Sequence, residues 1–318
     1  MSINFKKCFN LTLVLGLALC LTACSMVMAD TEEVISRSFN VAEGGKLTMD
    51  VDRASIKVET ESGNIVKVRA ILKVGTSSED KAKEIFAKYK IDFDHSGNNV
   101  TIKTDYHKRD GVFSWFGGKH LKVRFIVTVP QKYDLNVKTS GGSISIREIE
   151  GDVKAKTSGG SLKFEYVKGP VWGKTSGGSI SLEGCSGDAE VKTSGGSIRI
   201  GKVEGKVKAH TSGGSIKVKE VMGTIKASTS GGSVSAYISK QPAGDCKLTT
   251  SGGSITVSLE DNIKVDIDAK TSGGRVYTDF PVTIQGELSK RKLQAKINGG
   301  GPELYLRTSG GSIKIKKL

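Results

Sequence analysis

The 318-residue sequence is poor in aromatic residues, which make up 6% of the chain, and it contains five prolines and five cysteines. Scarce aromatics argue against a stacking platform for single-stranded nucleic acid. No nucleic-acid-binding motif is recognisable either, so we expect no nucleic-acid partner. The four histidines lack the spacing of metal ligands, and we therefore expect no metal site and no cofactor. They are His95, His107, His120 and His210.

The sequence also lacks the patterns of common hydrolases. None of its serines lies in a Gly-x-Ser-x-Gly elbow, and acids do not follow the glycines at a fixed place, as they do in calcium-binding β-rolls. The acids that could cleave a polysaccharide fall in different columns of the repeat described below. They are Asp134, Glu165, Glu183, Glu190 and Glu220. We therefore expect that the protein has no enzymatic activity. The alternative is a carbohydrate-active enzyme with two or three acids grouped in a groove.

What the sequence has in abundance is glycine, with 40 residues, many of them in a repeated Thr-Ser-Gly-Gly-Ser-Ile motif. Six copies follow one another at intervals of 18 residues, and Leu162 and Val234 replace Ile in two of them. Three more copies follow at wider spacing, one with Arg275 in place of serine. The nine copies begin at Thr139, Thr157, Thr175, Thr193, Thr211, Thr229, Thr250, Thr271 and Thr308. A fixed period of this kind indicates units that stack on one another.

One unit, residues 153–167, shows what is stacked. Apolar and charged residues alternate on both sides of Gly159 and Gly160, which is typical of two short strands joined by a glycine turn. The sequence therefore predicts an all-β fold, a parallel β-solenoid of about ten coils and on the order of 50 Å long at about 4.8 Å per coil. The motif threonines should point inward and form hydrogen bonds from coil to coil.

The N-terminus resembles that of an exported lipoprotein. Lys6 and Lys7 precede an apolar run, residues 11–21, that is too short for a transmembrane helix. The run ends in Leu21-Thr22-Ala23-Cys24, which is similar to a bacterial lipobox. The resemblance implies a signal peptide over residues 1–23, lipidation of Cys24, and a tether over residues 24–33. An ordinary signal peptide cut elsewhere is the alternative.

Two cysteines of the mature chain remain after the signal peptide and Cys24 are set aside. Cys185 and Cys246 fall at inward aliphatic positions of the repeat. They lie about three coils, or roughly 14 Å, apart by the stacking distance, which is too far for a disulfide. We expect two buried, inert thiols.

Residues 34–130 are expected to form a β-rich cap that shields the first edge of the solenoid, which occupies residues 131–318. The cap should contain one short helix that begins after Ser78 as N-cap, with a buried stripe of Ala82, Ile85, Phe86 and Tyr89. An aromatic stretch with Phe113, Trp115 and Phe116 is either a contact loop for lipid or a partner, or a loop folded onto the cap. At the other end, Lys314, Lys316 and Lys317 are expected to blunt the far edge.

One column of the repeat is basic. Lys138, Lys156, Lys174 and Lys192 all precede the motif threonine, and His210 continues the series. The formal net charge is +15 and the pI about 9.5, which suits anionic partners. The column is interpreted either as a solvated face that keeps the rod from associating, or as a strip that binds an acidic envelope polymer or glycan.

The chain resembles a known family in two places. Val127-Thr128-Val129-Pro130, followed by residues 135–142, resembles the bacterial putative-adhesin family of β-strand-repeat envelope proteins. Residues 297–301 and 308–313 look like that family's C-terminus. The similarity covers most of residues 35–318 and implies a surface or envelope-anchored protein. It implies no functional residues, because the shared motif is structural.

Together these features predict a lipid-anchored, non-enzymatic protein of the bacterial cell envelope, attached to the outer membrane where the organism has two membranes. Its solenoid would present a basic face for adhesion or scaffolding. Besides the enzyme alternative, an accessory role in envelope stress, with a signalling partner bound through the cap, is a third hypothesis.

Overall fold

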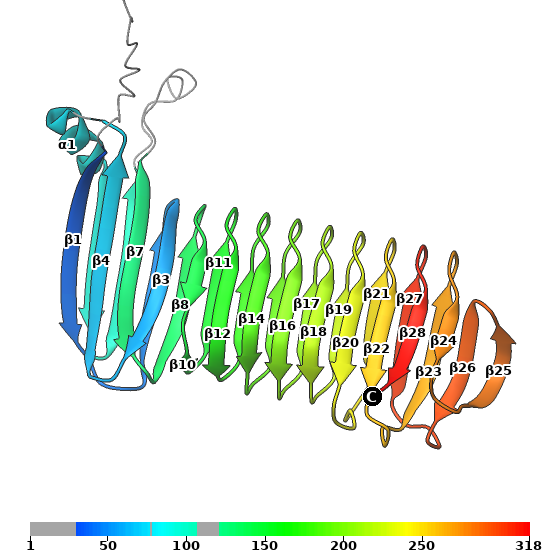
Figure 1. Ribbon diagram of the computed structural model, residues 1–318. Coiled ribbons are helices and arrows are strands. Elements are labelled where there is room, and N and C mark those ends of the chain that lie inside the picture. The colour runs from blue at the N-terminus through cyan, green and yellow to red at the C-terminus, as the bar shows by residue number, and fades with distance from the viewer. Residues whose placement is uncertain (1–29, 77, 107–120) are drawn as a thin grey trace, which may run out of the picture.

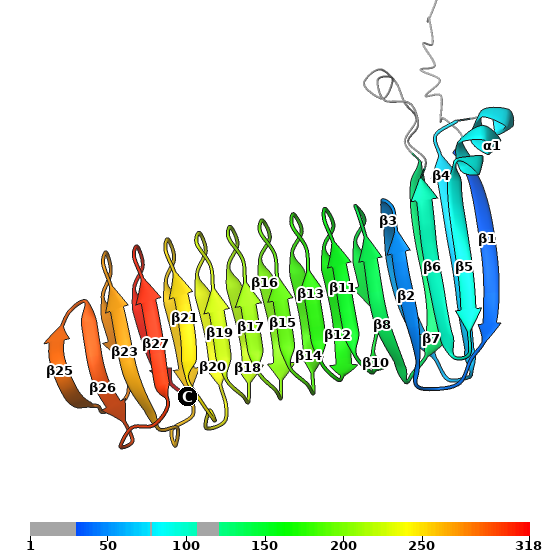
Figure 2. The ribbon, with the colours of Figure 1, turned by 180° about the vertical axis from the view of Figure 1, so that it is seen from behind.

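The computed structural model describes residues 30–76, 78–106 and 121–318. Cys24 and the aromatic stretch with Phe113, Trp115 and Phe116 lie outside these residues. Two long β-sheets, A and B, run along the molecule (Figures 1 and 2), with 14 strands in each. The one helix in the described part is α1 (Glu79–Ala87). The expected all-β, parallel β-solenoid class is confirmed.

Sheet A forms the near face in Figure 1, and β10 (Ile149–Glu150) pairs with one of its strands, β12. Its other strands, in spatial order, are β1 (Thr31–Asn40), β4 (Ile65–Val74), β7 (Lys122–Pro130), β3 (Ala54–Glu61), β9 (Ile144–Ile146), β12 (Leu162–Lys168), β14 (Ile180–Cys185), β16 (Ile198–Val203), β18 (Ile216–Val221), β20 (Val234–Ile238), β22 (Ile255–Leu259), β28 (Ile313–Lys317) and β24 (Val276–Thr278).

Sheet B is the near face in Figure 2. Its strands, from the same end of the molecule, are β5 (Tyr89–Ser96), β6 (Asn99–Tyr106), β2 (Gly45–Val51), β8 (Tyr133–Thr139), β11 (Val153–Thr157), β13 (Val171–Lys174), β15 (Ala189–Lys192), β17 (Val207–His210), β19 (Ile225–Ser228), β21 (Cys246–Thr250), β27 (Glu303–Thr308), β23 (Val265–Thr271), β26 (Lys292–Ile297) and β25 (Thr283–Ser289).

Each repeat contributes one strand to each sheet, and neighbouring repeats pair in parallel with an offset of 18 residues. Val153 of β11, for example, lies opposite Leu135 on one side and Val171 on the other. Buried and exposed residues alternate strictly along β11. The apolar side chains of both sheets therefore meet in one continuous core, which single two-strand units could not form.

The repeated geometry of the turns rests on two hydrogen bonds and one close backbone approach between successive coils. The Thr157 hydroxyl donates to the Gly142 carbonyl of the preceding coil at 2.7 Å, and the same bond recurs in the following coils. The backbone N–H of Ser161 donates to the Ser143 hydroxyl at 3.1 Å. A Cβ added to Gly160 would lie 2.2 Å from the Gly142 oxygen. The expected inward threonines are confirmed, and their bonds run to backbone carbonyls.

The order of coils in space differs from their order in sequence at both ends. In sheet B, β2 lies between β6 and β8, and in sheet A, β3 lies between β7 and β9. Likewise, β27 lies between β21 and β23 in sheet B, and β28 lies between β22 and β24 in sheet A. The expectation that Lys314, Lys316 and Lys317 blunt the far edge is therefore wrong, because β28 pairs on both sides, with β22 and β24.

Antiparallel strands end both sheets at the near end of the solenoid, which carries β1, and they end sheet B at the opposite, far end, where sheet A ends in β24, parallel to β28. At the far end, β26 and β25 follow β23 in antiparallel pairs. At the near end, β1 pairs with β4, and β5 with β6, in the same way. There the rings of Phe39 and Phe93 lie 6.2 Å apart, with Arg37 over Phe93. The strands of residues 34–130 thus belong to the same two sheets as the repeats.

The predicted Ser78 cap and the buried thiols are confirmed, but the predicted buried stripe of the helix is wrong in part, because Ile85 is half-buried and Tyr89 belongs to β5. The Ser78 side chain caps α1 by accepting from the Lys81 backbone N–H, and Ala82 and Phe86 are buried. No helix in the described residues is long and apolar enough to cross a membrane. Cys185 and Cys246 are buried and unpaired. Burial raises the pKa of Cys185 to about 12, and it also raises the pKa of Cys246.

Candidate functional site

The four lysines singled out from the sequence form one column on the outer face of sheet B. Lys138, Lys156, Lys174 and Lys192 lie opposite one another on β8, β11, β13 and β15. All four are exposed. His210 continues the column on β17, as expected, and Ser228 and Thr249 follow it on β19 and β21.

Strand alternation explains this placement. The motif threonine after each lysine is buried, as Thr157 is after Lys156, so the lysine must point to solvent. Successive ammonium groups start from backbones about 4.8 Å apart, which costs about 1 kcal/mol or less per pair in water. One acid relieves the first position, because Asp50 Oδ2 lies 3.9 Å from Lys138 Nζ.

A second lysine column runs beside the first and was missed in the sequence. It contains Lys154, Lys208, Lys226 and Lys247, with Trp172 and Glu190 at the intervening coils. Each lies two residues before the position that aligns with the first column on its own strand, which is Lys156, His210, Ser228 or Thr249, and about 6.6 Å from it along the strand. The signal was present as the same 18-residue period, but the interruption at two coils concealed it.

The two columns together make a basic face, defined here as the outward positions of sheet B from β8 to β21. It carries eight lysines and two carboxylates, Asp134 on β8 and Glu190 on β15, and Glu190 Oε2 lies 3.5 Å from Lys208 Nζ. The eight are Lys138, Lys154, Lys156, Lys174, Lys192, Lys208, Lys226 and Lys247. Uncompensated cations in a regular array attract polyanions.

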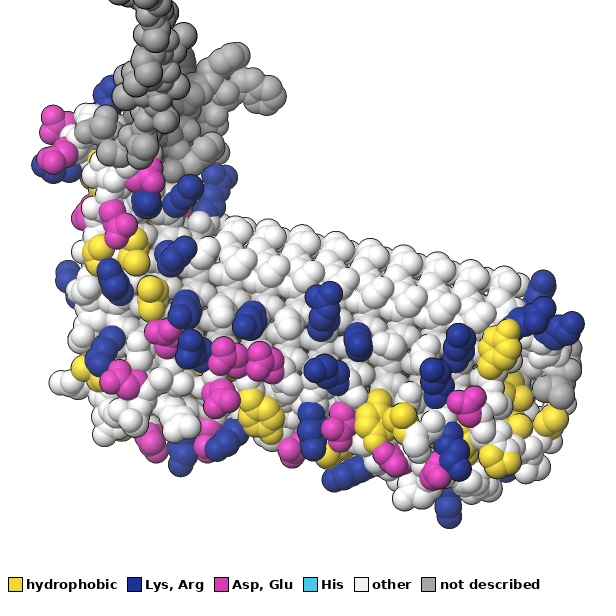
Figure 3. Space-filling model, viewed as in Figure 1, with side chains coloured by type: hydrophobic (Ala, Val, Ile, Leu, Met, Phe, Trp, Pro, Cys, Tyr) yellow, Lys and Arg dark blue, Asp and Glu magenta, His cyan; other side chains and the backbone are white. Residues whose placement is uncertain are grey.

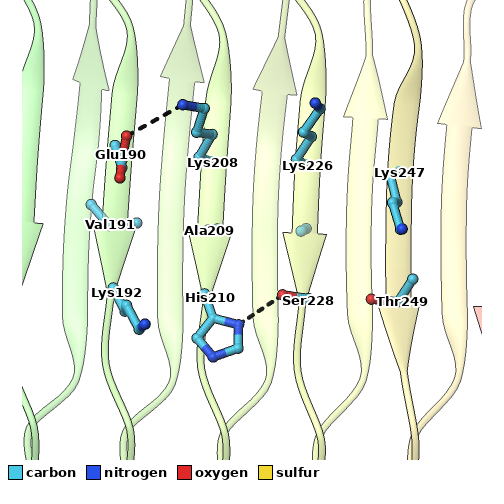
Figure 4. Close-up of a pocket in the computed structure, with 11 residues that line it drawn as sticks. Glu190, Val191, Lys192, Lys208, Ala209, His210, Lys226, Ser228, Lys247 and Thr249 are labelled. Carbon is cyan, nitrogen blue, oxygen red and sulfur yellow. Dashed lines mark hydrogen bonds and ion pairs between the residues drawn. The ribbon is translucent and has the colours of Figure 1, made fainter.

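The basic face is hollowed where the first lysine column ends. A depression of about 270 Å³ lies over β15, β17, β19 and β21 (Figure 4). His210 Nδ1 and the Ser228 hydroxyl are 2.7 Å apart at its centre, and Thr249 follows on the next strand. Lys192 and Lys226 stand around these shorter side chains. The depression therefore offers hydroxyl groups surrounded by ammonium groups, a suitable environment for an anionic group.

Acids border the basic face at the start of its strands, but they have structural partners. Asp134 Oδ1 accepts from the backbone N–H of Asp152, and Asp188 Oδ1 accepts in the same way from Lys206. Beyond β21, Tyr305 stacks under Lys247 at 4.9 Å and under Arg307 at 4.1 Å. The basic face thus ends at an aromatic residue on β27.

The acids named from the sequence are divided between the two sheets. Asp134 and Glu190 lie on sheet B, and Glu165, Glu183 and Glu220 lie on sheet A. A different pair, Asp92 and Asp94 on β5, lines a depression of about 340 Å³ with Lys103.

The His210–Ser228 contact resembles the nucleophile and base of a hydrolase, but no carboxylate bonds the histidine in the described residues. Nor do the described residues include a cluster of His, Cys, Asp or Glu that could hold a metal ion.

The fold and the basic face define a parallel β-solenoid with a lysine-rich stretch on one sheet, from β8 to β21. The chain belongs to the Toastrack DUF4097 family, whose pattern it matches over residues 45–316. This match confirms the resemblance to the putative-adhesin family inferred from the sequence.

Several solved structures are similar to this chain. A putative adhesin from Parabacteroides merdae is 14% identical, with a TM-score of 0.46, and the match covers 90% of this chain and 96% of that one. A putative adhesin from Bacteroides fragilis is 13% identical, with a TM-score of 0.41 and coverage of 90% and 97%. A putative lipid binding protein from Parabacteroides distasonis is 14% identical, with a TM-score of 0.40 and coverage of 90% and 96%. No curated protein matches the chain.

Proposed function

We propose that this protein is a lipid-anchored, non-enzymatic component of the bacterial cell envelope that acts in adhesion or scaffolding by binding acidic polymers along the basic face of sheet B. The observation that carries the proposal is the array of eight lysines against two carboxylates, of which Asp134 accepts a backbone hydrogen bond from Asp152. An array fixed by the β-sheet register keeps its charges in place without ordering a loop, which lowers the entropy lost on binding.

The geometry favours an extended polyanion over a small ligand. From β8 to β21 the lysines extend over about 29 Å at about 4.8 Å per strand. Each exposed contact contributes little by itself, roughly 0.2–1 kcal/mol, so useful affinity requires many contacts made at once. Such binding should weaken as salt screens the exposed charges.

The proposed anchor rests on Leu21-Thr22-Ala23-Cys24. Lipidation at Cys24 would hold the near end of the solenoid, where β1 begins, at the membrane. A Cys24→Ser chain should leave the membrane fraction of cells that export it, whereas the unchanged chain should stay there. Equal amounts of both chains in the membrane fraction would contradict the anchor.

Replacing the first lysine column tests the proposed binding. In the chain from Ser25 onward, changing Lys138, Lys156, Lys174 and Lys192 to serine should reduce the affinity for an acidic polysaccharide at least about tenfold at low salt. Binding to a neutral glycan should not change. The affinities can be measured by calorimetry over a series of salt concentrations.

A control variant removes the same charge from sheet A, by serine at Lys163, Lys217, Lys314 and Lys316. All four side chains are exposed on the outer face of that sheet. This variant should keep most of the affinity. If the two variants lose affinity equally, the protein attracts polyanions by net charge alone and the basic face is not a site.

A further inference from the structure

A second basic site lies at the near end of the solenoid, on the outer face of sheet A. It is a depression of about 460 Å³ over the neighbouring strands β1, β4, β7 and β3. Arg53, Lys73, Lys122 and Arg124 supply four cations to its lining, and Glu32 supplies one acid. In Figure 3, several Lys and Arg side chains lie over this end of sheet A, with Asp and Glu side chains among them.

Charges in this depression are poorly balanced within the protein. Lys73 is paired with Asp30 at 2.9 Å, and that contact raises the pKa of Lys73. Directly opposite Lys73 in the antiparallel pair of β4 and β7 is a like charge, Lys122, an arrangement that destabilises a sheet. Neither Arg53, Lys122 nor Arg124 has an ion pair within the described part of the chain. Asp30 and Glu32 together offset two of the four cations, so the cluster has an excess of two positive charges.

The backbone and the apolar neighbours suggest a built surface. Arg53 has a φ of 44°, in the left-handed region that non-glycine residues seldom adopt, and its backbone N–H is held by the Ser140 hydroxyl at 2.9 Å. Beside the cations, Ile71 lies opposite Val34 of β1, whose side chain is 43% exposed. Cations bordered by exposed aliphatic groups suit the boundary between phospholipid headgroups and acyl chains.

The position of the depression relative to the proposed anchor decides between possible ligands. Asp30 is held at its edge by Lys73, and the hydroxyl of Thr31 donates to the Thr76 carbonyl at 2.6 Å. Five residues, 25–29, lie between Cys24 and Asp30, so a lipid on Cys24 would lie within about 20 Å of Asp30. The site would then be at headgroup depth, where anionic lipids attract each nearby Lys or Arg by about 1 kcal/mol.

We infer that Arg53, Lys73, Lys122 and Arg124 bind the phosphates of anionic phospholipid headgroups and so orient the anchored solenoid on the membrane. The inference rests on the lipid anchor of the proposed function. Arginine suits phosphate because its planar guanidinium donates two parallel hydrogen bonds. The basic face of sheet B would then remain free for polymers.

The test uses sedimentation with vesicles and the unlipidated chain from Ser25, which includes every described residue. Vesicles contain phosphatidylcholine alone, or phosphatidylcholine with phosphatidylglycerol. The chain should bind only the mixed vesicles. Changing Arg53, Lys122 and Arg124 to glutamine should reduce this binding at least about tenfold. A control with Lys163, Arg199 and Lys217 changed to glutamine removes equal charge from the middle of the same sheet and should retain binding.

Either of two results would overturn the inference. One is a lack of binding to the mixed vesicles, and the other is an equal loss in both glutamine variants, which would show attraction by net charge. The serine variant of the first lysine column separates this site from the basic face. If the serine variant loses vesicle binding while the glutamine variant of Arg53, Lys122 and Arg124 retains it, the inferred phospholipid site on sheet A is wrong. The proposed polymer site on sheet B is then unaffected.

Discussion

At the scale of residues, the two glycines of the motif have different reasons to be there. The second glycine of a coil lies directly on a carbonyl of the preceding coil, as Gly160 does on Gly142. The first has more room, because a Cβ on Gly159 would lie 3.1 Å from the Gly141 oxygen. Neither Gly159 nor Gly160 has a positive φ. Close stacking of backbones, and not an unusual conformation, therefore requires glycine at the second position.

This difference gives a matched pair of substitutions. Gly160→Ala places a Cβ 2.2 Å from a backbone oxygen, and the overpacking should reduce the free energy of unfolding by about 1–3 kcal/mol. Gly159→Ala requires a shift of only a few tenths of an ångström and should cost clearly less. Urea unfolding followed by circular dichroism measures both. Equal losses would show that backbone contact between coils does not select the second glycine.

The two thiols give a prediction on pH and reactivity. Burial raises the pKa of Cys185 to about 12, above its ordinary value of 9.0. At pH 8 the folded protein then has about one thiolate in ten thousand, and the thiolate is the reactive form. Iodoacetamide followed by mass spectrometry should leave Cys185 and Cys246 unmodified in the folded protein, and it should modify both in urea.

The same shift has a sign for stability. Because the pKa of Cys185 is higher in the folded than in the unfolded chain, the neutral thiol contributes to the stability of the folded state. That contribution to the free energy of unfolding is complete below about pH 9 and is lost between about pH 9 and 12. The free energy of unfolding should fall over that range. It should fall less in a Cys185→Ala chain. Rapid alkylation of the folded chain at pH 8 would contradict the buried state of these thiols.

At the scale of elements, the coil of β27 and β28 has an unusual place. It is the last coil in sequence, yet it lies between the coil of β21 and β22 and the coil of β23 and β24. Its backbone groups pair on both sides in both sheets. The strands that follow it in space depend on it for parallel pairing, although they precede it in the chain.

Removing residues 299–318 should therefore leave a gap between the coil of β21 and β22 and the coil of β23 and β24, and should not simply shorten the solenoid. Amides of β23 and β24 should lose protection in hydrogen exchange, because their parallel neighbours are gone. Amides of β11 to β16 serve as an internal control and should keep their protection. Unchanged protection of β23 would show that the β23–β26 unit is held without the inserted coil.

The strand register was predictable from the sequence, and the order of the coils at the ends was not. The period of 18 residues fixes which residues lie opposite one another, as for Lys138, Lys156 and Lys174. The order at the ends depends on which edge a returning segment pairs with. Residues 45–61 and 303–317 alternate like any coil, and alternation does not encode a neighbour. The second lysine column was hidden because Trp172 and Glu190 interrupt it.

At the scale of the whole molecule, the surfaces differ in charge. Along the edge where the motif turns lie, Figure 3 shows a band without charged or hydrophobic side chains, and below it acids and bases are mixed on sheet A. Sheet B, on the opposite side, has the uncompensated lysines. This asymmetry underlies the central claim, that polyanions bind the molecule on one face.

The most direct test of that claim extends the first lysine column. Changing His210, Ser228 and Thr249 to lysine continues it over β17, β19 and β21. A control with Ser181, Ser235 and Thr256 changed to lysine adds equal charge to outward positions of sheet A. Calorimetry against one acidic polysaccharide, over a series of salt concentrations, compares both variants with the unchanged chain.

The sheet B variant should bind about ten- to a hundredfold more tightly, at roughly 0.5–1 kcal/mol per added lysine, and its affinity should fall more steeply with salt. The sheet A control should gain much less. Equal gains in both variants, or no gain in the sheet B variant, would contradict binding at the basic face.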